Sequence, residues 1–242
     1  MNNLLVNGCS YTAGSGMAGG DNNISPIVWS NHLADRFDTV DNLAMGGESN
    51  DRIVRTTLDF CNNHDMTDYA VIIQWTSVYR SEYWNAERKE WVNVVVNNGL
   101  QGADEWTLST NEDTDGRIRD AYDKEMKWLN SPNDYNIAYY NNILILQNYF
   151  EYMDIPYMFS CMTLQDHPCC DPTLMDLMHL LNRTTTEINL RRLMDKSKWS
   201  ELSLAKYSGD NYISQEDSHP NLKGNKLIAQ ALYKELMEKY GR

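Results

Sequence analysis

Two polar turns, far apart in the sequence, carry residue types that suit nucleophilic chemistry. Ser10 lies in "NGCSYTAGSG", directly after the apolar run "LLV", and His219 lies in "QEDSHPN", just after Glu216 and Asp217. A serine hydroxyl needs a base within hydrogen-bond reach and donors for the developing oxyanion. A histidine oriented by a carboxylate is such a base. The two turns therefore predict a serine nucleophile if the fold joins them; the alternative is a surface loop in which Asp217 and His219 only face water.

The first turn has other interpretations. A phosphate-binding loop needs the spacing G-x-x-x-x-G-K-[ST] or G-x-G-x-x-G, and this turn has neither. The first lysine of the chain is Lys89, so no such cation is close in sequence. Cys9 is a second candidate nucleophile, because a thiol is intrinsically more reactive than a hydroxyl. Neighbouring residues in such a turn point in opposite directions, so with Ser10 facing a cleft we expect Cys9 to be buried and inert.

A metal site is a further chemistry that the residue types raise. Cys169 and Cys170 are adjacent, with His167 and His179 nearby. There is no C-x-x-C pair with a matching second pair, and isolated cysteines more often act as small buried hydrophobes. We therefore expect no metal.

The elements that must position these turns alternate between strand and helix patterns. Apolar runs predict strands at "NNLLVNG", "DTVDNLAMGG", "YAVIIQW" and "IPYMFSCM". Helical spacing predicts helices in "SPIVWSNHLADRF", "SNDRIVRTTLDFCNN" and "DYNIAYYNNILILQNYFEYM", and a last helix capped by Asn221. The buried face expected for this last helix is Leu227, Ile228, Ala231, Leu232 and Leu236. Strands alternating with helices favour an α/β fold with a parallel sheet.

Two segments interrupt this alternation in what we expect to be a single domain over residues 1–242. Residues 80–131 are polar and rich in Trp, with "EWVNVVVNNG" as a hairpin arm and "IRDAYDKEMKWL" as a helix. Loops this long are usually functional or disordered, and the aromatic content argues against disorder, so we expect a lid over the sheet edge. Residues 164–212 form a second insertion, with helices expected around 172–182 and 185–196.

Composition argues against several kinds of partner. A net charge of -13 over 242 residues leaves no basic stripe for a phosphate backbone, so we expect no nucleic-acid partner. No apolar run approaches the roughly 20 residues of a membrane span, and the sequence start lacks a signal-peptide pattern. The five cysteines, an odd number, fit a reducing compartment better than a disulfide framework. These features predict a cytoplasmic protein.

Three sequence blocks, taken in order, resemble those of the SGNH or GDSL hydrolases, a superfamily of esterases and lipases. The first is "VNGCSYT", in which Ser10 stands where the family has the serine of Gly-Asp-Ser, and similar "GCSYT" turns occur in a phage-like and bacterial branch. The second is "NLAMGGESND", whose Asn42 and Gly47 match the spacing of the family's Asn and oxyanion-hole glycine. The last is "DSHPNLKGN", which contains His219.

The resemblance implies a three-layer α/β/α sandwich with a central parallel sheet, the flavodoxin-like SGNH hydrolase fold, carrying aromatic-rich insertions. It implies a serine hydrolase in which Ser10 attacks a carbonyl, His219 takes the serine proton, and the amides of Ser10 and Gly47 hold the oxyanion. Either Glu216, at the family's usual spacing, or Asp217, the shorter side chain that we prefer, orients the histidine. The implied substrate is a carboxylic ester, an acetylated carbohydrate or a thioester, and no cofactor is implied.

One block departs from the family pattern. The family's third block is Gly-x-Asn-Asp, whose Asn donates to the oxyanion, but here the strand ends in "QWTSVYR". Thr76 or Ser77 falls where that Asn would be, so the third donor is a hydroxyl, another residue such as Asn50, or absent. Loss of one such donor raises the barrier by about 2.7 to 4 kcal/mol. The alternative function is therefore a weak or inactive binding or structural module, for instance one that recognises carbohydrate.

Two residues after this strand are further candidates for the substrate pocket. Tyr79 and Arg80 follow at the carboxyl edge of the predicted sheet. Arg80 suits a substrate carboxylate or sulfate, and the alternative is a surface ion pair with one of the many acidic residues.

Overall fold

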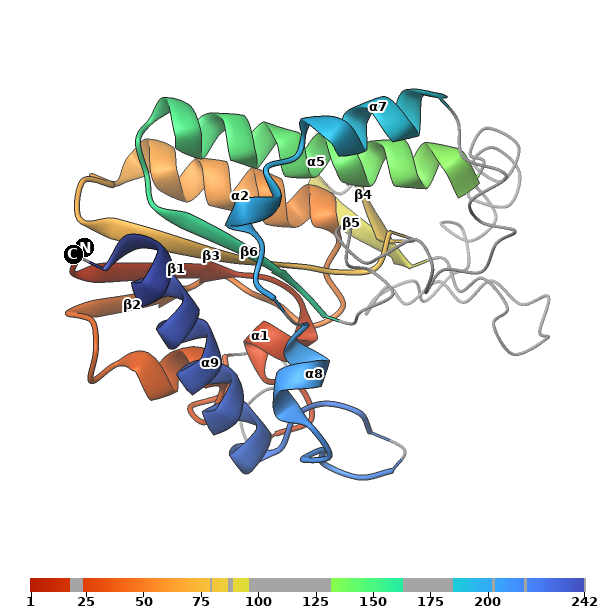
Figure 1. The fold of residues 1–242 in the computed structure, drawn as a ribbon. Helices are drawn as coiled ribbons and strands as arrows, with labels where there is room; N and C mark the ends of the chain where they lie inside the picture. Colours follow the sequence, from red (N-terminus) through yellow and green to blue (C-terminus); the bar gives the residue numbers. More distant parts are fainter. Residues whose placement is uncertain are drawn as a thin grey trace.

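A sheet of four parallel strands, in the order β2-β1-β3-β6, runs through the middle of the molecule in this computed structural model (Figure 1). The strands are β1 (Asn3–Asn7), β2 (Thr39–Asn42), β3 (Tyr69–Trp75) and β6 (Tyr157–Cys161). The structure describes residues 1–17, 24–78, 80–86, 89–95, 132–162, 185–201, 203–215 and 217–241. All four predicted strands and the parallel sheet are confirmed.

The register of the sheet brings the ends of its two inner strands together. β1 pairs with β3 from Asn3 opposite Tyr69 to Asn7 opposite Ile73, and with β2 on its other side. Both inner strands are apolar and almost wholly buried, as expected for parallel strands covered on both faces. The chain leaves β1 for one neighbour and returns to the other, and ligand sites in open α/β sheets lie at such a switch point, beyond the carboxyl ends of the strands.

One face of the sheet is covered by α2 (Asn50–Asn63), α5 (Pro132–Tyr152) and α7 (Thr185–Leu193) (Figure 1). The helix pattern predicted α2 and α5 correctly, and the Ser49 hydroxyl caps α2 by accepting from the Arg52 amide at 3.2 Å. Ile143, Leu146 and Phe150 of α5 are fully buried against the sheet.

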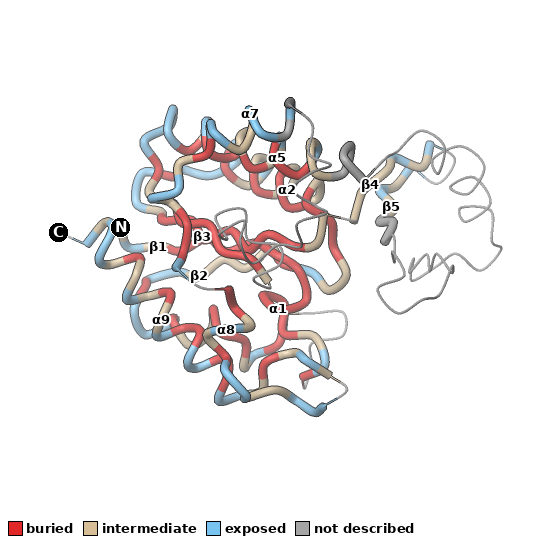
Figure 2. The backbone as a smooth tube through the Cα atoms, turned by 45° about the vertical axis from the view of Figure 1, so that its right-hand side comes forward, coloured by how far each residue is buried: buried red, intermediate tan, exposed pale blue. Residues whose placement is uncertain are grey.

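The other face is covered by α1 (Ser10–Ala13), the 3-10 helix η1 (Trp29–Leu33), α8 (Leu204–Ser208) and α9 (Leu222–Tyr240). Figure 2 shows the buried sheet between the two helical layers. Asn221 caps α9 as predicted, accepting from the amides of Lys223 and Gly224. Ile228, Leu232 and Leu236 of the expected buried face are fully buried, and these i, i+4 neighbours face the sheet. The expectation is wrong at Leu227, which is 37% exposed, and Ala231 is only partly buried, because both lie off this row.

The helix predicted in "SPIVWSNHLADRF" is much shorter than expected. Only Trp29–Leu33 are helical, and they form a 3-10 turn. Side chains from elsewhere hold this segment: Asn225 accepts from the Trp29 amide at 2.8 Å, and Asn42 donates to the Ser30 hydroxyl at 2.9 Å. Such side-chain bonds compete with a continuous helical ladder.

A separate antiparallel hairpin lies beyond the carboxyl edge of the sheet (Figures 1 and 2). It consists of β4 (Arg80–Asn85) and β5 (Glu90–Val95), with Trp84 opposite Trp91. The hairpin arm predicted in "EWVNVVVNNG" is confirmed, whereas β4 was not expected as a strand. The predicted helices "IRDAYDKEMKWL" and 172–182 lie outside the described residues.

The later part of the predicted second insertion packs onto the main body. The helix expected at 185–196 is confirmed as α7, which ends at Leu193, and a short 3-10 helix, η5 (Lys196–Lys198), follows it. Trp199 then forms a parallel bridge with Phe159 of β6, and the Ser200 amide donates to the Phe159 carbonyl at 2.7 Å. This segment therefore extends the central sheet at its β6 edge.

Candidate active site

Ser10 opens α1 immediately beyond β1, in a turn fixed by polar side chains. The Asn7 side chain accepts from the Gly8 amide at 2.8 Å and donates to the Ile53 carbonyl of α2 at 3.1 Å. A Cβ on Gly8 would lie 2.7 Å from Gln74 Oε1, so only glycine fits beneath that side chain. The result is an ordered turn in which Ser10 is 8% exposed.

Gln74 holds the candidate Ser10 turn and was missed by sequence reasoning. It is fully buried in β3, accepts from the Cys9 amide and the Thr12 hydroxyl at 3.1 Å each, and donates to the Trp75 carbonyl at 2.7 Å. The available signal was a polar residue inside an otherwise apolar strand, because a buried amide must find partners. Asn7, at the end of "NLLVN", carries the same signal.

Cys9 is fully buried, as expected, but its surroundings are polar. Its Sγ lies 3.4 Å from Gln74 Oε1 and 3.8 Å from Ser10 Oγ. Burial raises the pKa of the Cys9 thiol, but the positive charge of Arg80 and the neighbouring hydrogen-bonding groups together lower it below its ordinary value. The positive charge of Arg80 therefore acts on the residue next to Ser10.

His219 and Asp217 form a close pair in the loop before α9. Asp217 Oδ1 lies 2.6 Å from His219 Nδ1 and also accepts from the His219 backbone amide at 3.0 Å. Burial raises the pKa of Asp217, but its bonds to the backbone and side chain of His219 outweigh burial and lower it below the ordinary range. Asp217 therefore stays ionised beside the imidazole. Glu216, the other expected acid, lies outside the described residues.

Tyr11 connects this loop to the Ser10 turn. The centroids of the Tyr11 and His219 rings are 5.1 Å apart, and the Tyr11 hydroxyl donates to the Ser218 carbonyl at 2.9 Å. His219 Nε2 is buried and has no hydrogen-bond partner among the residues that the structure describes. The Ser10 hydroxyl and His219 thus lie in packed segments without a direct hydrogen bond, and such bonds are often long in ligand-free sites.

The turn after β2 lies next to the Ser10 turn. Asn42 donates to the Thr12 carbonyl of α1 at 2.8 Å, and the Met45 amide donates to the Gly8 carbonyl at 3.4 Å. Gly47 has a φ of 79°, in the left-handed region that glycine adopts without strain. The backbone amides of Ser10 and Gly47 have no acceptor within the described part of the chain.

The side chain of Asn50, at the start of α2, forms hydrogen bonds with the backbone that follows β3. Its amide donates to the carbonyls of Thr76 at 3.1 Å and Ser77 at 3.2 Å, and its oxygen accepts from the Thr76 amide at 3.0 Å. An oxyanion role for Asn50 would require one of these bonds to open. Thr76 and Ser77 directly follow β3, as predicted. Thr76 is fully buried and Ser77 is half-buried.

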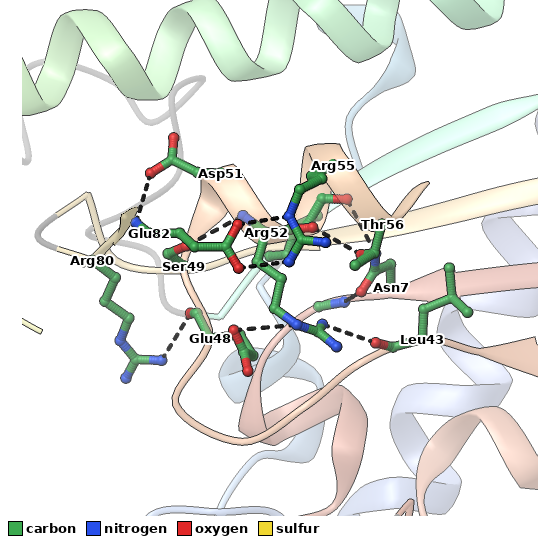
Figure 3. A network of polar contacts seen from close by, with 12 residues as sticks. Asn7, Leu43, Glu48, Ser49, Asp51, Arg52, Arg55, Thr56, Arg80 and Glu82 are labelled. Atoms are coloured by element: carbon green, nitrogen blue, oxygen red, sulfur yellow. Dashed lines mark hydrogen bonds and ion pairs between the residues drawn. The ribbon is translucent and has the colours of Figure 1, made fainter. Parts of the chain in front are cut away.

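Arg80 lies at the start of β4, next to a polar network shown in Figure 3. Two residues further along, Glu82 accepts from Arg55 at 2.6 and 2.8 Å in a two-pronged pair. Arg80 itself donates to the Glu48 carbonyl at 3.5 Å, beside Gly47. Tyr79, the remaining pocket candidate, lies outside the described residues.

A pocket of about 450 Å³ lies between α2 and the turn after β2. It is bounded by Arg52, Thr56 and Phe60 of α2 and by Leu43 and Gly46 of the turn. Ser10 and His219 do not line it. The described residues contain no cluster of His, Cys, Asp and Glu fit to hold a metal. None of the described helices is long and apolar enough to cross a membrane.

Two solved structures share this fold over nearly their whole length. The crystal structure of TesA matches with a TM-score of 0.52 at 11% identity, over 98% of this chain and 99% of that chain. The psychrotrophic esterase EstA from Pseudoalteromonas sp., in a structure inhibited by monoethylphosphonate, matches with a TM-score of 0.50 at 14% identity, over 99% and 98%. No protein-family model and no curated protein matches the chain.

At such low identities these likenesses establish the fold. They agree with the four-stranded parallel sheet and its two helical layers, which the sequence predicted. The chain therefore has the α/β/α fold of the SGNH or GDSL hydrolases.

Proposed function

We propose that this protein is a serine hydrolase that cleaves a carboxylic ester, with Ser10 as the nucleophile. The observation that carries the proposal is the pairing of His219 with Asp217 at 2.6 Å, which leaves the other imidazole nitrogen buried and without a partner. That histidine packs on Tyr11, the residue after Ser10. A carboxylate-oriented imidazole beside a serine that follows a central strand is the arrangement expected of a catalytic triad.

The chemistry follows from this arrangement. The Ser10 oxygen attacks the ester carbonyl while its proton passes to His219 Nε2, and Asp217 stabilises the imidazolium that forms. The tetrahedral intermediate collapses as His219 returns the proton to the leaving alcohol, which gives an acyl-enzyme. Water, activated by the same imidazole, then attacks the acyl carbonyl, and the carboxylic acid departs from Ser10.

Backbone amides provide the oxyanion contacts in this proposal. The amides of Ser10 and Gly47 both lack acceptors within the described residues, and hydrogen bonds tie their two turns together. Preorganised donors of this kind are usually the largest single contribution to such catalysis. We assign Asn50 to positioning the turn after β3, because its amide groups are already used there.

The fold neighbours support this assignment. EstA is an esterase, and its solved structure is inhibited by monoethylphosphonate. Phosphonates mimic the tetrahedral intermediate of acyl transfer, so a reagent of this class is a direct probe for Ser10.

A covalent labelling experiment tests the proposal. A fluorophosphonate should label the purified protein at Ser10, and Ser10→Ala should abolish labelling and lower kcat on 4-nitrophenyl butyrate at least about a thousandfold. Ser197→Ala, which removes an exposed hydroxyl in η5, serves as the control and should label like the wild type. Turnover that survives Ser10→Ala would exclude Ser10 as the nucleophile.

A binding or structural module remains the second candidate, because two observations favour it. The amide donors of Asn50 are occupied, so this side chain does not supply the third oxyanion donor. Trp84 and Trp91, which are 51% and 46% exposed, form an aromatic pair on the hairpin that suits a sugar ring. Saccharide binding without turnover on a broad ester panel would support this candidate, and Ser10-dependent turnover would exclude it.

A further inference from the structure

Arg80 lies at the edge of the proposed catalytic centre and has no carboxylate partner among the described residues. Two neighbouring arginines are both paired: Arg52 with Glu48 at 3.3 Å, and Arg55 with Glu82 at 2.6 Å. Arg80 has no carboxylate within ion-pair distance in the described part of the chain, and its guanidinium donates to the Glu48 carbonyl at 3.5 Å.

The backbone that carries Arg80 is held from both sides. Before it, Asn50 binds the carbonyls of Thr76 and Ser77. After it, the Glu82 side chain is clamped by Arg55, and the Glu82 amide donates to Asp51 at 3.1 Å. Figure 3 shows that Arg80 points toward Glu48 and away from the Arg55–Glu82 pair. These contacts therefore fix the position of Arg80 without neutralising its charge.

The Arg80 guanidinium faces the turns that carry the proposed oxyanion donors. It donates to the carbonyl of Glu48, the residue after Gly47, and its charge lowers the pKa of Cys9, the residue before Ser10. The side chain is partly exposed, so a substrate can reach it. A planar guanidinium with free donors matches a carboxylate in a two-pronged geometry.

We propose that Arg80 is a specificity-determining residue that binds a carboxylate carried by the substrate ester. This inference rests on the proposed hydrolase function and names its substrate class: esters with an anionic carboxylate on the acyl or the alcohol side of the scissile bond. In a chain of net charge -13, which repels anions, this cation compensates locally for an unfavourable field.

The experiment compares matched pairs of esters on the full-length protein. On the acyl side, the 4-nitrophenyl half-esters of succinate, glutarate and adipate are compared with butyrate, pentanoate and hexanoate esters. On the alcohol side, 4-carboxyphenyl acetate is compared with phenyl acetate. Arg80→Gln should lower the ratio of kcat/KM, anionic over neutral, about ten- to a hundredfold for the preferred pair, the range of one charge-assisted hydrogen bond.

Two variants serve as comparisons. Arg192→Gln changes the net charge equally at an exposed position of α7 and should leave the ratio unchanged. Arg80→Lys keeps the charge without the planar fork and should restore part of the preference. Circular dichroism and urea unfolding establish that each variant is folded. The preference should also weaken with added salt, because the guanidinium is partly exposed.

The outcomes separate this inference from the proposed function. Equal losses on both members of every pair, or no preference by the wild type for any carboxylate ester, would overturn the role of Arg80. If no ester shows Ser10-dependent turnover, the hydrolase proposal fails instead. Calorimetric binding of adipate, succinate and 4-hydroxybenzoate then decides: binding lost in Arg80→Gln supports the carboxylate site, and binding that is absent or unchanged overturns it.

Discussion

Asp217 and His219 form the contact on which the proposed chemistry depends. With Asp217 ionised, His219 Nδ1 carries the proton that it donates across 2.6 Å, so Nε2 is left as the acceptor that a general base needs. The short sequence separation makes this pairing local, because the carboxylate also holds the backbone amide of His219. The loop therefore presents one tautomer and one ring orientation.

Asp217→Asn should lower kcat on a neutral ester at least about a hundredfold with little change in KM, because an amide neither fixes this tautomer nor stabilises the imidazolium. Steady-state kinetics with 4-nitrophenyl butyrate measure the effect. Asp210→Asn, an exposed carboxylate at the start of the same loop, is the control and should behave like the wild type. A kcat for Asp217→Asn equal to that of the control would remove Asp217 from the mechanism.

The same contact gives a pH dependence of stability. The folded-state pKa of Asp217 is lowered, so its contribution is present above the unfolded value of about 3.9 and is lost as pH falls through the lower folded pKa. The difference in Tm between wild type and Asp217→Asn should be present at about pH 5 and shrink below about pH 4. A difference that grows as the pH falls from about 5 to about 3 would contradict this sign.

At the scale of elements, the site is assembled from the turns that follow three parallel strands. The Ser10 turn follows β1, the Gly47 turn follows β2, and residues Thr76 and Ser77 follow β3. Helix α2 joins them, because Asn50 at its first turn binds the backbone after β3 and Ile53 accepts from Asn7 of β1. A side chain at a helix start thus sets the distance between two strand ends.

Asn50→Ala should destabilise the fold by about 2 to 4 kcal/mol, because it leaves buried backbone groups of Thr76 without partners. Urea unfolding measures the loss. Asn63→Ala, at the exposed end of the same helix, should change stability by only about 0.5 kcal/mol. Equal stabilities of the two variants would show that Asn50 does not hold the turn.

At the scale of the whole molecule, two apolar cores share one sheet. Ile143 of α5 belongs to the core on one face and Ile228 of α9 to the core on the other, and both are fully buried. Because strands β1 and β3 contribute side chains to both cores, loss of packing on one face weakens the support of the other. The site, at the end of these strands, depends on both.

Ile143→Ala and Ile228→Ala should each lower the free energy of unfolding by about 2 to 5 kcal/mol, within a single transition. Circular dichroism and tryptophan fluorescence, followed in the same urea titration, measure both the loss and the coincidence of the two signals. Ile145→Ala is the control, since Ile145 lies on the same helix and is 47% exposed. Separate transitions for the two signals would contradict a shared sheet that couples the cores.

Sequence patterns predicted the sheet because short continuous apolar runs in a chain of this length are buried most readily as central strands. The cap of α9 was equally visible, since Asn221 acts within three residues. The 3-10 turn at Trp29–Leu33 was not, because Asn225 reaches it from far along the chain. Strand β4 was missed for the same reason, because its residue Glu82 pairs with Arg55 of α2, which lies far from it in the sequence.

For the site, the sequence by itself determined the order of the blocks and the adjacency of Asp217 to His219, because those depend on spacing along the chain. Only the tertiary structure decided that Tyr11 packs on His219, that Gln74 lies over the Ser10 turn, and that Arg80 donates to the Glu48 carbonyl. These contacts join residues dozens to hundreds of positions apart. They arise when parallel strands align their carboxyl ends, and no local pattern encodes that alignment.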